Sequence, residues 1–319
     1  MSSFDATSST LVSATAGPTS TSLKDVIALG KPGISMMAAI VAAGTYLLAV
    51  PVVDAASLVR GFFGVCGIGL IVMGAGAFNM LLERDIDALM TRTQNRPLVA
   101  GRMAPITAFV VGAVWCLSSL PLLWSFGPPG PGRGLTVGLG LFSLFLYVLV
   151  YTPMKRTSAW SLVVGAIPGA MPALMGATLA AGRVEIAGVA MFAVAFVWQL
   201  PHFLAISLYR EAEYVRAGHK ISPPAVGVDT TKALIIATTV PLCALGVALW
   251  PLGLGGPVYA VVAVVVGAWF CFTAIKGARR ASRKDDDAWA KKVFIGSLIW
   301  QTVVFGALAV DRLIAAVVA

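Results

Sequence analysis

Charged residues are scarce in this chain. Of its 319 residues only 12% are Asp, Glu, Lys or Arg, about half the share that soluble domains carry. Hydrophobic residues make up 58%, and they gather in runs of about 20 residues, the length that spans a bilayer as a helix. Open sheet edges cannot face lipid, so the composition predicts an all-α, polytopic membrane protein.

Cysteine and histidine are rare as well. The four cysteines lie inside apolar runs and show no C-x-x-C or metal-type spacing, which indicates packing rather than redox chemistry. The net charge of +9 comes mainly from residues between the apolar runs, where basic side chains set orientation and meet anionic headgroups. We therefore expect contact with the lipid bilayer and no nucleic acid partner.

The first 22 residues are rich in Ser, Thr and Ala and contain no basic residue. This composition is typical of a disordered tail, so we expect a tail over residues 1–22 and one membrane domain over 23–319. A secretory signal needs a basic start and an apolar core, and an organelle transit peptide is Arg-rich. The sequence therefore favours a bacterial inner (plasma) membrane.

Nine apolar runs are long enough to cross a membrane. They cover residues 26–50, 58–82, 104–126, 134–152, 159–181, 186–209, 232–252, 256–275 and 289–317. Lys and Arg concentrate in every second connection, so the positive-inside rule predicts a cytoplasmic N-terminus and an outside C-terminus. Three adjacent aspartates, residues 285–287, are expected in a solvated loop.

One polar stripe stands out at the end of the second apolar run. Asn79, Glu83 and Asp87 are spaced i, i+4 and i+8, so they share one face of a helix. Carboxylate and amide oxygens suit Mg²⁺ when phosphate oxygens and water complete its shell. Arg92 and Arg96 follow closely, and arginine binds phosphate bidentately. The stretch predicts a metal and diphosphate site.

Two further clusters lie at the same predicted membrane face. Pro153 ends the fourth run and is followed by Lys155 and Arg156, which could bind phosphate or snorkel to headgroups. His202 lies within the sixth run, where it could ligate haem iron or hold a substrate carboxylate.

The loop after the sixth run carries Arg210, Glu211, Glu213 and Tyr214. The two glutamates are candidates for a second metal site, although their spacing alone does not specify one. His219 is expected to be an ordinary loop residue.

Four ordered motifs resemble the UbiA superfamily of membrane prenyltransferases and, within it, the branch that farnesylates protohaem. They are the 79–98 stretch beginning Asn-Met-Leu-Leu-Glu-Arg-Asp-Ile-Asp, Tyr-Thr-Pro-Met-Lys-Arg at 151–156, Gly-Ala-Ile-Pro-Gly-Ala-Met-Pro at 165–172, and Trp-Gln-Leu-Pro-His-Phe at 198–203. Glu83 departs from the aspartate that the superfamily usually has there, and the second aspartate-rich motif is degenerate.

The resemblance implies nine helices around a cavity with Mg²⁺ at its polar mouth. It implies farnesyl transfer from farnesyl diphosphate to the vinyl group of haem b, giving haem O for haem-copper oxidases, with haem A synthase or oxidase assembly proteins as possible partners. The implied roles are metal binding for Asn79, Glu83 and Asp87, catalysis for these three and Lys155, and substrate binding for Arg92, Arg96, Arg156, His202, Arg210, Glu213 and Tyr214.

Two other functions remain open from the sequence. A UbiA-type prenyltransferase acting on a quinone precursor or another aromatic acceptor would keep the 79–98 motif but would not need His202. A non-catalytic transporter would suit nine glycine-rich spans, yet it would not need three oxygen ligands in register beside an arginine pair.

Overall fold

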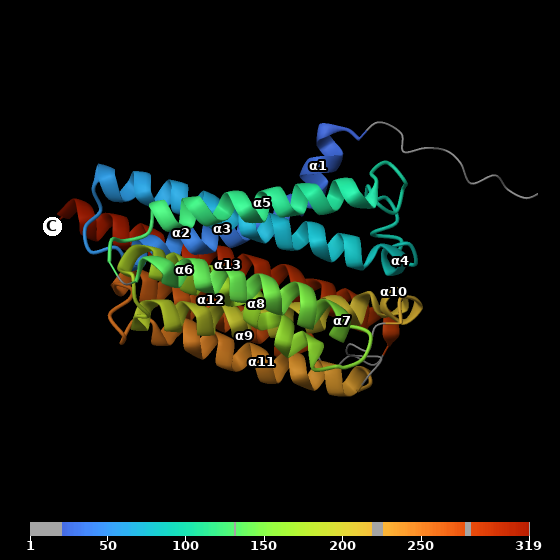
Figure 1. The fold of residues 1–319 in the computed structure, drawn as a ribbon. Coiled ribbons are helices and arrows are strands. Elements are labelled where there is room, and N and C mark those ends of the chain that lie inside the picture. Colours follow the sequence, from blue (N-terminus) through green and yellow to red (C-terminus); the bar gives the residue numbers. More distant parts are fainter. Residues whose placement is uncertain (1–20, 131, 219–225, 278–281, 319) are drawn as a thin grey trace, which may run out of the picture.

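The structure is a computed structural model that describes residues 21–130, 132–218, 226–277 and 282–318. These residues form helices and connecting turns, without a strand. The helices, shown in Figure 1, are α1 (Leu23–Leu29), α2 (Pro32–Ala49), α3 (Ala55–Leu82), α4 (Arg84–Asp87), α5 (Pro105–Ser125), α6 (Arg133–Phe145), the π-helical stretch η1 (Leu146–Tyr151), α7 (Thr152–Met154), α8 (Ser161–Ala181), α9 (Ile186–Tyr209), α10 (Glu211–Arg216), α11 (Val228–Ala248), α12 (Pro257–Gly277) and α13 (Arg283–Val318).

Within the described ranges, nine helical segments are long and apolar enough to cross a membrane. The fourth runs through α6, η1 and α7 without interruption, from Arg133 to Met154. The long helices lie side by side, with α4, α7 and α10 at one end of the bundle and the C-terminus at the other (Figure 1). The expected all-α, polytopic membrane fold is confirmed.

The first expected span, residues 26–50, is wrong at its start. The chain forms two helices there, α1 and α2, separated by Gly30 and Lys31. Lys31 has a left-handed backbone with φ of 49°, and Pro32 opens α2 at a position where its missing N–H costs nothing. The expected tail lies outside the described residues except for Thr21 and Ser22, and Ser22 is the N-cap of α1.

The expectation of a solvated loop over residues 285–287 is also wrong. These aspartates lie in the first turns of α13, where negative charge is stabilised by the helix dipole. Ser282 accepts a hydrogen bond from the backbone N–H of Asp285. Asp286 is buried and accepts a hydrogen bond of 2.8 Å from Lys232 of α11, which ties the two helices together.

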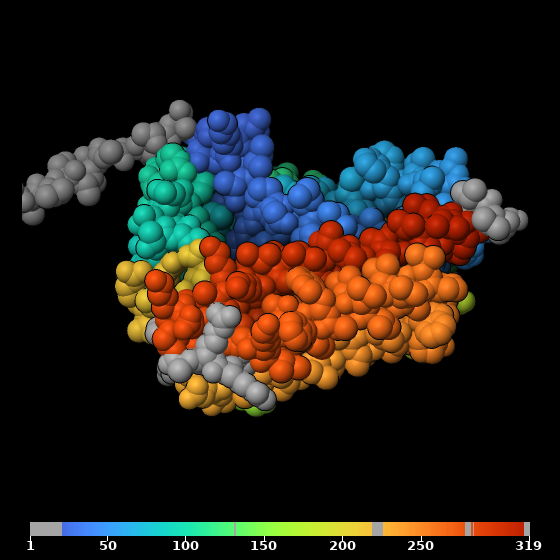
Figure 2. All heavy atoms as spheres, turned by 180° about the vertical axis from the view of Figure 1, so that it is seen from behind, coloured from blue at the N-terminus to red at the C-terminus, as the bar shows by residue number. Residues whose placement is uncertain are grey.

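Six spans surround a central cavity, and three lie outside it. The cavity is lined from α2, α3, α6 with η1, α8, α9 and α13, whereas α5, α11 and α12 contribute no lining residue. α12 and α13 cover much of the face seen in Figure 2. Close packing of α2 against α8 depends on Gly176, because a Cβ there would lie 2.1 Å from the backbone oxygen of Ala42.

Candidate functional site

The cavity has a volume of about 500 Å³ and one strongly charged end. The charged end lies beside α4 and α10, at the same end of the bundle (Figure 1). The charged side chains that line this end are Lys31, Glu83, Asp87, Arg92, Arg96 and Lys155, and the cavity is also lined by Tyr147, Tyr151 and Tyr214. The rest of the wall is mainly apolar, so the cavity is amphipathic along its length.

The predicted stripe keeps its helical register although α3 ends at Leu82. The N–H of Glu83 donates to the carbonyl of Asn79 at 2.9 Å, and the N–H of Asp87 donates to the carbonyl of Glu83 at 2.8 Å. These i to i+4 bonds carry the stripe across the junction into α4. All three side chains are buried, and Glu83 and Asp87 line the cavity while Asn79 lies behind its surface.

Each oxygen group of the stripe faces a cation. Lys155 donates to Glu83 at 2.7 Å, Arg96 pairs with Asp87, and Lys31 donates to the side-chain oxygen of Asn79. Three cations and three oxygen-bearing side chains therefore meet at one end of the cavity.

The amide of Asn79 is held on its other side as well. It donates to the hydroxyl of Thr152 at 2.9 Å, just before Pro153. This bond links the stripe to the segment that carries Lys155, so the two sequence motifs are joined directly.

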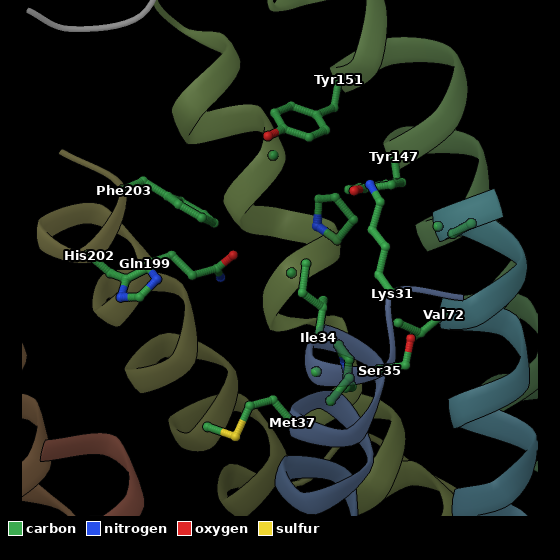
Figure 3. A pocket seen from close by; sticks show the side chains of 18 of the residues that line it. Lys31, Ile34, Ser35, Met37, Val72, Tyr147, Tyr151, Gln199, His202 and Phe203 are labelled. Atoms are coloured by element: carbon green, nitrogen blue, oxygen red, sulfur yellow. The ribbon is translucent and has the colours of Figure 1, made fainter. Parts of the chain in front are cut away.

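Lys31 lines the candidate site although the sequence analysis did not single it out. The turn at Gly30 and Lys31 places its side chain in the cavity, opposite Gln199 and His202 (Figure 3). Burial, followed by repulsion from Arg96 and Lys155, lowers the pKa of Lys31 to about 7. A basic residue directly before a proline that opens an apolar run was the available signal.

The oxygen groups of the stripe suit Mg²⁺ better than a softer metal. No cluster of three His, Cys, Asp or Glu side chains close enough to hold a metal occurs among the described residues, so a closed, all-protein metal site is not built here. Two carboxylates that face an open cavity match Mg²⁺, which takes one or two protein carboxylates and fills its shell with phosphate oxygens and water. The residues fit such a metal.

The remaining predicted site residues divide into two groups. Arg92 and Tyr214 line the charged end, and burial raises the pKa of the Tyr214 hydroxyl. Arg156 is exposed and does not line the cavity. Arg210 pairs with Glu213 at 2.6 Å outside the lining. His219 lies outside the described residues.

His202 lies deeper in the cavity wall, packed between Trp198 and Phe294 with ring centroids 4.6 and 4.5 Å away. Its Nδ1 is 2.8 Å from the hydroxyl of Ser297. That hydroxyl donates its only hydrogen to the carbonyl of Phe294 at 2.7 Å, so it accepts from Nδ1–H. The other ring nitrogen, Nε2, therefore carries a lone pair.

The deep part of the cavity between α3, α6 and α8 is apolar. Ile71, Gly140 and Met175 meet there, since a Cβ at Gly140 would lie about 3 Å from both other side chains. Met175 follows Ser161, the first residue of α8, by 14 positions, which corresponds to a depth of roughly 20 Å. This part can dissolve a long hydrocarbon chain.

Comparison with known proteins gives one consistent family. The sequence model of the UbiA prenyltransferase family matches residues 36–298. A protoheme IX farnesyltransferase of Anaeromyxobacter dehalogenans (strain 2CP-C) is 42% identical over 290 residues, which cover 91% of this chain and 94% of that protein. Protoheme IX farnesyltransferase 1 of Bacillus subtilis (strain 168) is 34% identical over 300 residues, with 90% of each chain covered.

Solved structures share the fold at low sequence identity. A structure of digeranylgeranylglyceryl phosphate synthase has a TM-score of 0.72 at 14% identity and covers 91% of this chain and 98% of that one. A UbiA homologue from Archaeoglobus fulgidus, bound to GPP and Mg²⁺, has a TM-score of 0.64 at 14% identity, with 89% and 99% covered. With its family motifs gathered around one cavity, the chain belongs to the UbiA prenyltransferase family.

Proposed function

We propose that this protein transfers the farnesyl group of farnesyl diphosphate to the vinyl group of haem b, giving haem O and diphosphate. Relatives that carry the name protoheme IX farnesyltransferase are 34–42% identical over most of the chain. The observation that carries the proposal is one cavity with four cations at one end, an apolar depth and an imidazole in its wall. These parts match a diphosphate, an isoprenoid chain and a haem.

The charged end would bind the diphosphate. Lys31, Arg96 and Lys155 are already held there by the polar stripe, and Arg92 lies at the rim. The barrier to the reaction is charge separation, because the carbon–oxygen bond breaks while negative charge grows on the leaving group. Fixed cations in a cavity screened from water stabilise that charge.

Glu83 and Asp87, with Asn79 behind them, would hold Mg²⁺. When bound, the metal supplies positive charge to the departing diphosphate. The Archaeoglobus fulgidus homologue bound to GPP and Mg²⁺ supports the requirement. Lys155 and Arg96, which pair with these two carboxylates, would contact the phosphate oxygens beside the metal.

The apolar wall would protect the allylic cation from water while the vinyl carbon attacks it. His202 would position the haem. Of the two roles expected from the sequence, the tautomer favours iron, because a nitrogen with a lone pair ligates iron but cannot donate to a carboxylate. Water adds afterwards to complete the hydroxyethylfarnesyl side chain.

The charged end of the cavity would face the cytoplasm of a bacterial inner membrane. The basic residues around it follow the positive-inside pattern, and farnesyl diphosphate is a water-soluble anion at its head. Haem A synthase or oxidase assembly proteins would receive the product in the membrane.

Reconstitution tests the proposal directly. Purified protein in lipid, given haem b, farnesyl diphosphate and Mg²⁺, should form haem O, identified by mass, and should release diphosphate. Release of diphosphate only when a quinone precursor replaces haem would assign the protein to another branch of the family. No release with any acceptor would favour a transporter.

A further inference from the structure

Two glutamines line the cavity at the level of the membrane core. Gln199 of α9 and Gln301 of α13 are 5% and 4% exposed, and both line the cavity. Neither was singled out from the sequence, and neither has a task in the binding of diphosphate or of metal. A buried amide in a membrane is costly unless its hydrogen bonds are made, so each calls for an explanation.

The orientation of Gln199 is fixed by its neighbours. Its Nε2 donates to the backbone oxygens of Ala166 at 3.0 Å and Ala195 at 3.1 Å. Since both partners are acceptors, the nitrogen must face them and Oε1 must face away. The oxygen lies over Gly169, where a Cβ would approach it to 1.9 Å, and the side chain reaches toward the middle of the cavity (Figure 3).

Gln301 carries the same kind of group on α13, which packs beside α9 in the cavity wall. Its Oε1 is buried and accepts no hydrogen bond from the described residues. An unmet acceptor of this kind costs about 1–3 kcal/mol. The site therefore favours a ligand that can donate a hydrogen bond.

The two amides lie at about the same depth. α9 and α13 are the sixth and ninth spans, so they run in opposite directions. Ser297 contacts both His202 and Trp198. One turn deeper on α13 is Gln301, and one turn deeper on α9 than His202 are Trp198 and Gln199. The two glutamines thus lie in one region of the cavity wall, on two neighbouring helices.

Hydrogen-bond chemistry identifies the ligand, and this step rests on the proposed function. Diphosphate and ionised propionates only accept hydrogen bonds. The farnesyl chain neither donates nor accepts them, and the pyrrole nitrogens of haem are bound to iron. Water is the one reactant that donates, and it donates twice. We infer that Gln199 and Gln301 form a binding site for the water whose oxygen becomes the hydroxyl group of haem O.

The step balances with the reactants already named. The carbon–oxygen bond of farnesyl diphosphate breaks, and its electron pair leaves with diphosphate. The vinyl electron pair forms the new carbon–carbon bond, which leaves a cation on the vinyl carbon next to the porphyrin. A lone pair of the held water bonds to that carbon, and the released diphosphate accepts one water proton. The amide oxygens act as positioning groups, because they orient the water without exchanging a proton.

Product composition tests this site. If water is not held beside the cation, the cation loses a proton instead and gives a farnesylated alkene, lighter than haem O by one water. In water labelled with heavy oxygen, the unmodified protein should give labelled haem O. The Gln199→Met/Gln301→Met variant should raise the ratio of alkene to haem O by about tenfold, as expected for lost hydrogen bonds.

The controls separate a water site from a general packing effect. Leu298→Met changes the same wall of α13 without removing an acceptor, and it should leave the product ratio unchanged. Gln301→Glu keeps an acceptor oxygen and should retain haem O as the main product. Gln301→Met alone carries the test if the double variant does not assemble, because no described hydrogen bond depends on Gln301.

Two negative results have different meanings. An unchanged product ratio in variants that still farnesylate haem would overturn the water site and leave the haem acceptor standing. If the unmodified protein forms no farnesylated haem, the proposed function fails, and the water site fails with it.

Discussion

Lys31 is half-buried at the charged end of the cavity, where it faces Asn79 and stands near two other cations. Loss of one member of a buried charged pair typically costs about 2–5 kcal/mol of binding. We therefore expect Lys31→Met to weaken farnesyl diphosphate binding by tenfold or more, measured as the dissociation constant in detergent. Lys24→Met, an exposed change on α1, is the matched control.

The same substitution should lower the thermal stability of the protein only by a small amount. An apolar side chain of similar length leaves the buried oxygen of Asn79 without the donor that Lys31 supplies, which typically costs about 1–3 kcal/mol. A large drop in melting temperature, with diphosphate affinity unchanged, would show that Lys31 is structural.

Asp87 is the carboxylate for which a metal role is easiest to isolate. Asp87→Asn keeps the shape and removes the charge, and we expect turnover to fall by about 10² to 10³ while haem b still binds with its normal absorption spectrum. Asp85→Asn is the control, because Asp85 lies two residues away, is exposed and pairs with the exposed Arg84. Equal haem O production by both variants would contradict the metal assignment.

Candidate site residues could be predicted from the sequence where they recur at a regular helical spacing. Asn79, Glu83 and Asp87 share a helical face, and that regularity is visible in the sequence. Lys31 and Gln301 carry no such pattern: each is a single polar residue beside or within an apolar run. Their importance comes from what faces them across the cavity, and only the packing of distant helices determines that.

Two adjacent residues near the end of α13 join three helices. Asp311 accepts hydrogen bonds from the backbone N–H groups of Gly256 at 2.7 Å and Tyr259 at 3.0 Å, at the start of α12. Arg312 donates to the backbone oxygens of Leu47 at 3.2 Å and Val50 at 2.8 Å, at the end of α2. The unpaired N–H groups at the start of α12 and the unpaired carbonyl groups at the end of α2 thereby obtain hydrogen-bond partners.

The hydrogen bonds of Asp311 and Arg312 should stabilise the folded protein far from the charged end of the cavity. Arg312→Met should lower the free energy of unfolding by about 1.5–3 kcal/mol, the range for hydrogen bonds to charged groups, seen as a lower melting temperature in detergent. Arg183→Met removes an exposed ion pair with Glu185 and should change stability little. Diphosphate affinity should be the same in both variants, and equal melting temperatures would refute a stabilising role for Arg312.

Helix existence was easier to predict than helix limits. Hydropathy located all nine spans because bilayer thickness sets their length. It merged α1 with the first span, since Val26, Ile27 and Leu29 continue the apolar run without a gap. The break follows instead from Pro32 and the left-handed backbone of Lys31. A hydrogen bond of 2.9 Å from the Arg102 side chain to Asp25 fixes α1 against the loop before α5.

On the scale of the whole molecule, the charged groups lie at one end, and this asymmetry predicts the orientation. Lys31, Arg96 and Lys155 all reach the same end of the cavity, and the sequence places most other basic residues in loops on that side. Since cytoplasmic loops collect Lys and Arg, the N-terminus should be inside and the end of α13 outside. The substrate head and the metal would then enter from the cytoplasm.

Reporter fusions check this orientation. A reporter enzyme that works only outside the cytoplasm should be active when fused after residue 319 and inactive when fused after Arg156, between the fourth and fifth spans. A reporter that fluoresces only in the cytoplasm should give the reverse result at both positions. The opposite pattern would place the cations of the cavity outside the cell, away from cytoplasmic farnesyl diphosphate, and would contradict both the orientation and the proposed route of that substrate.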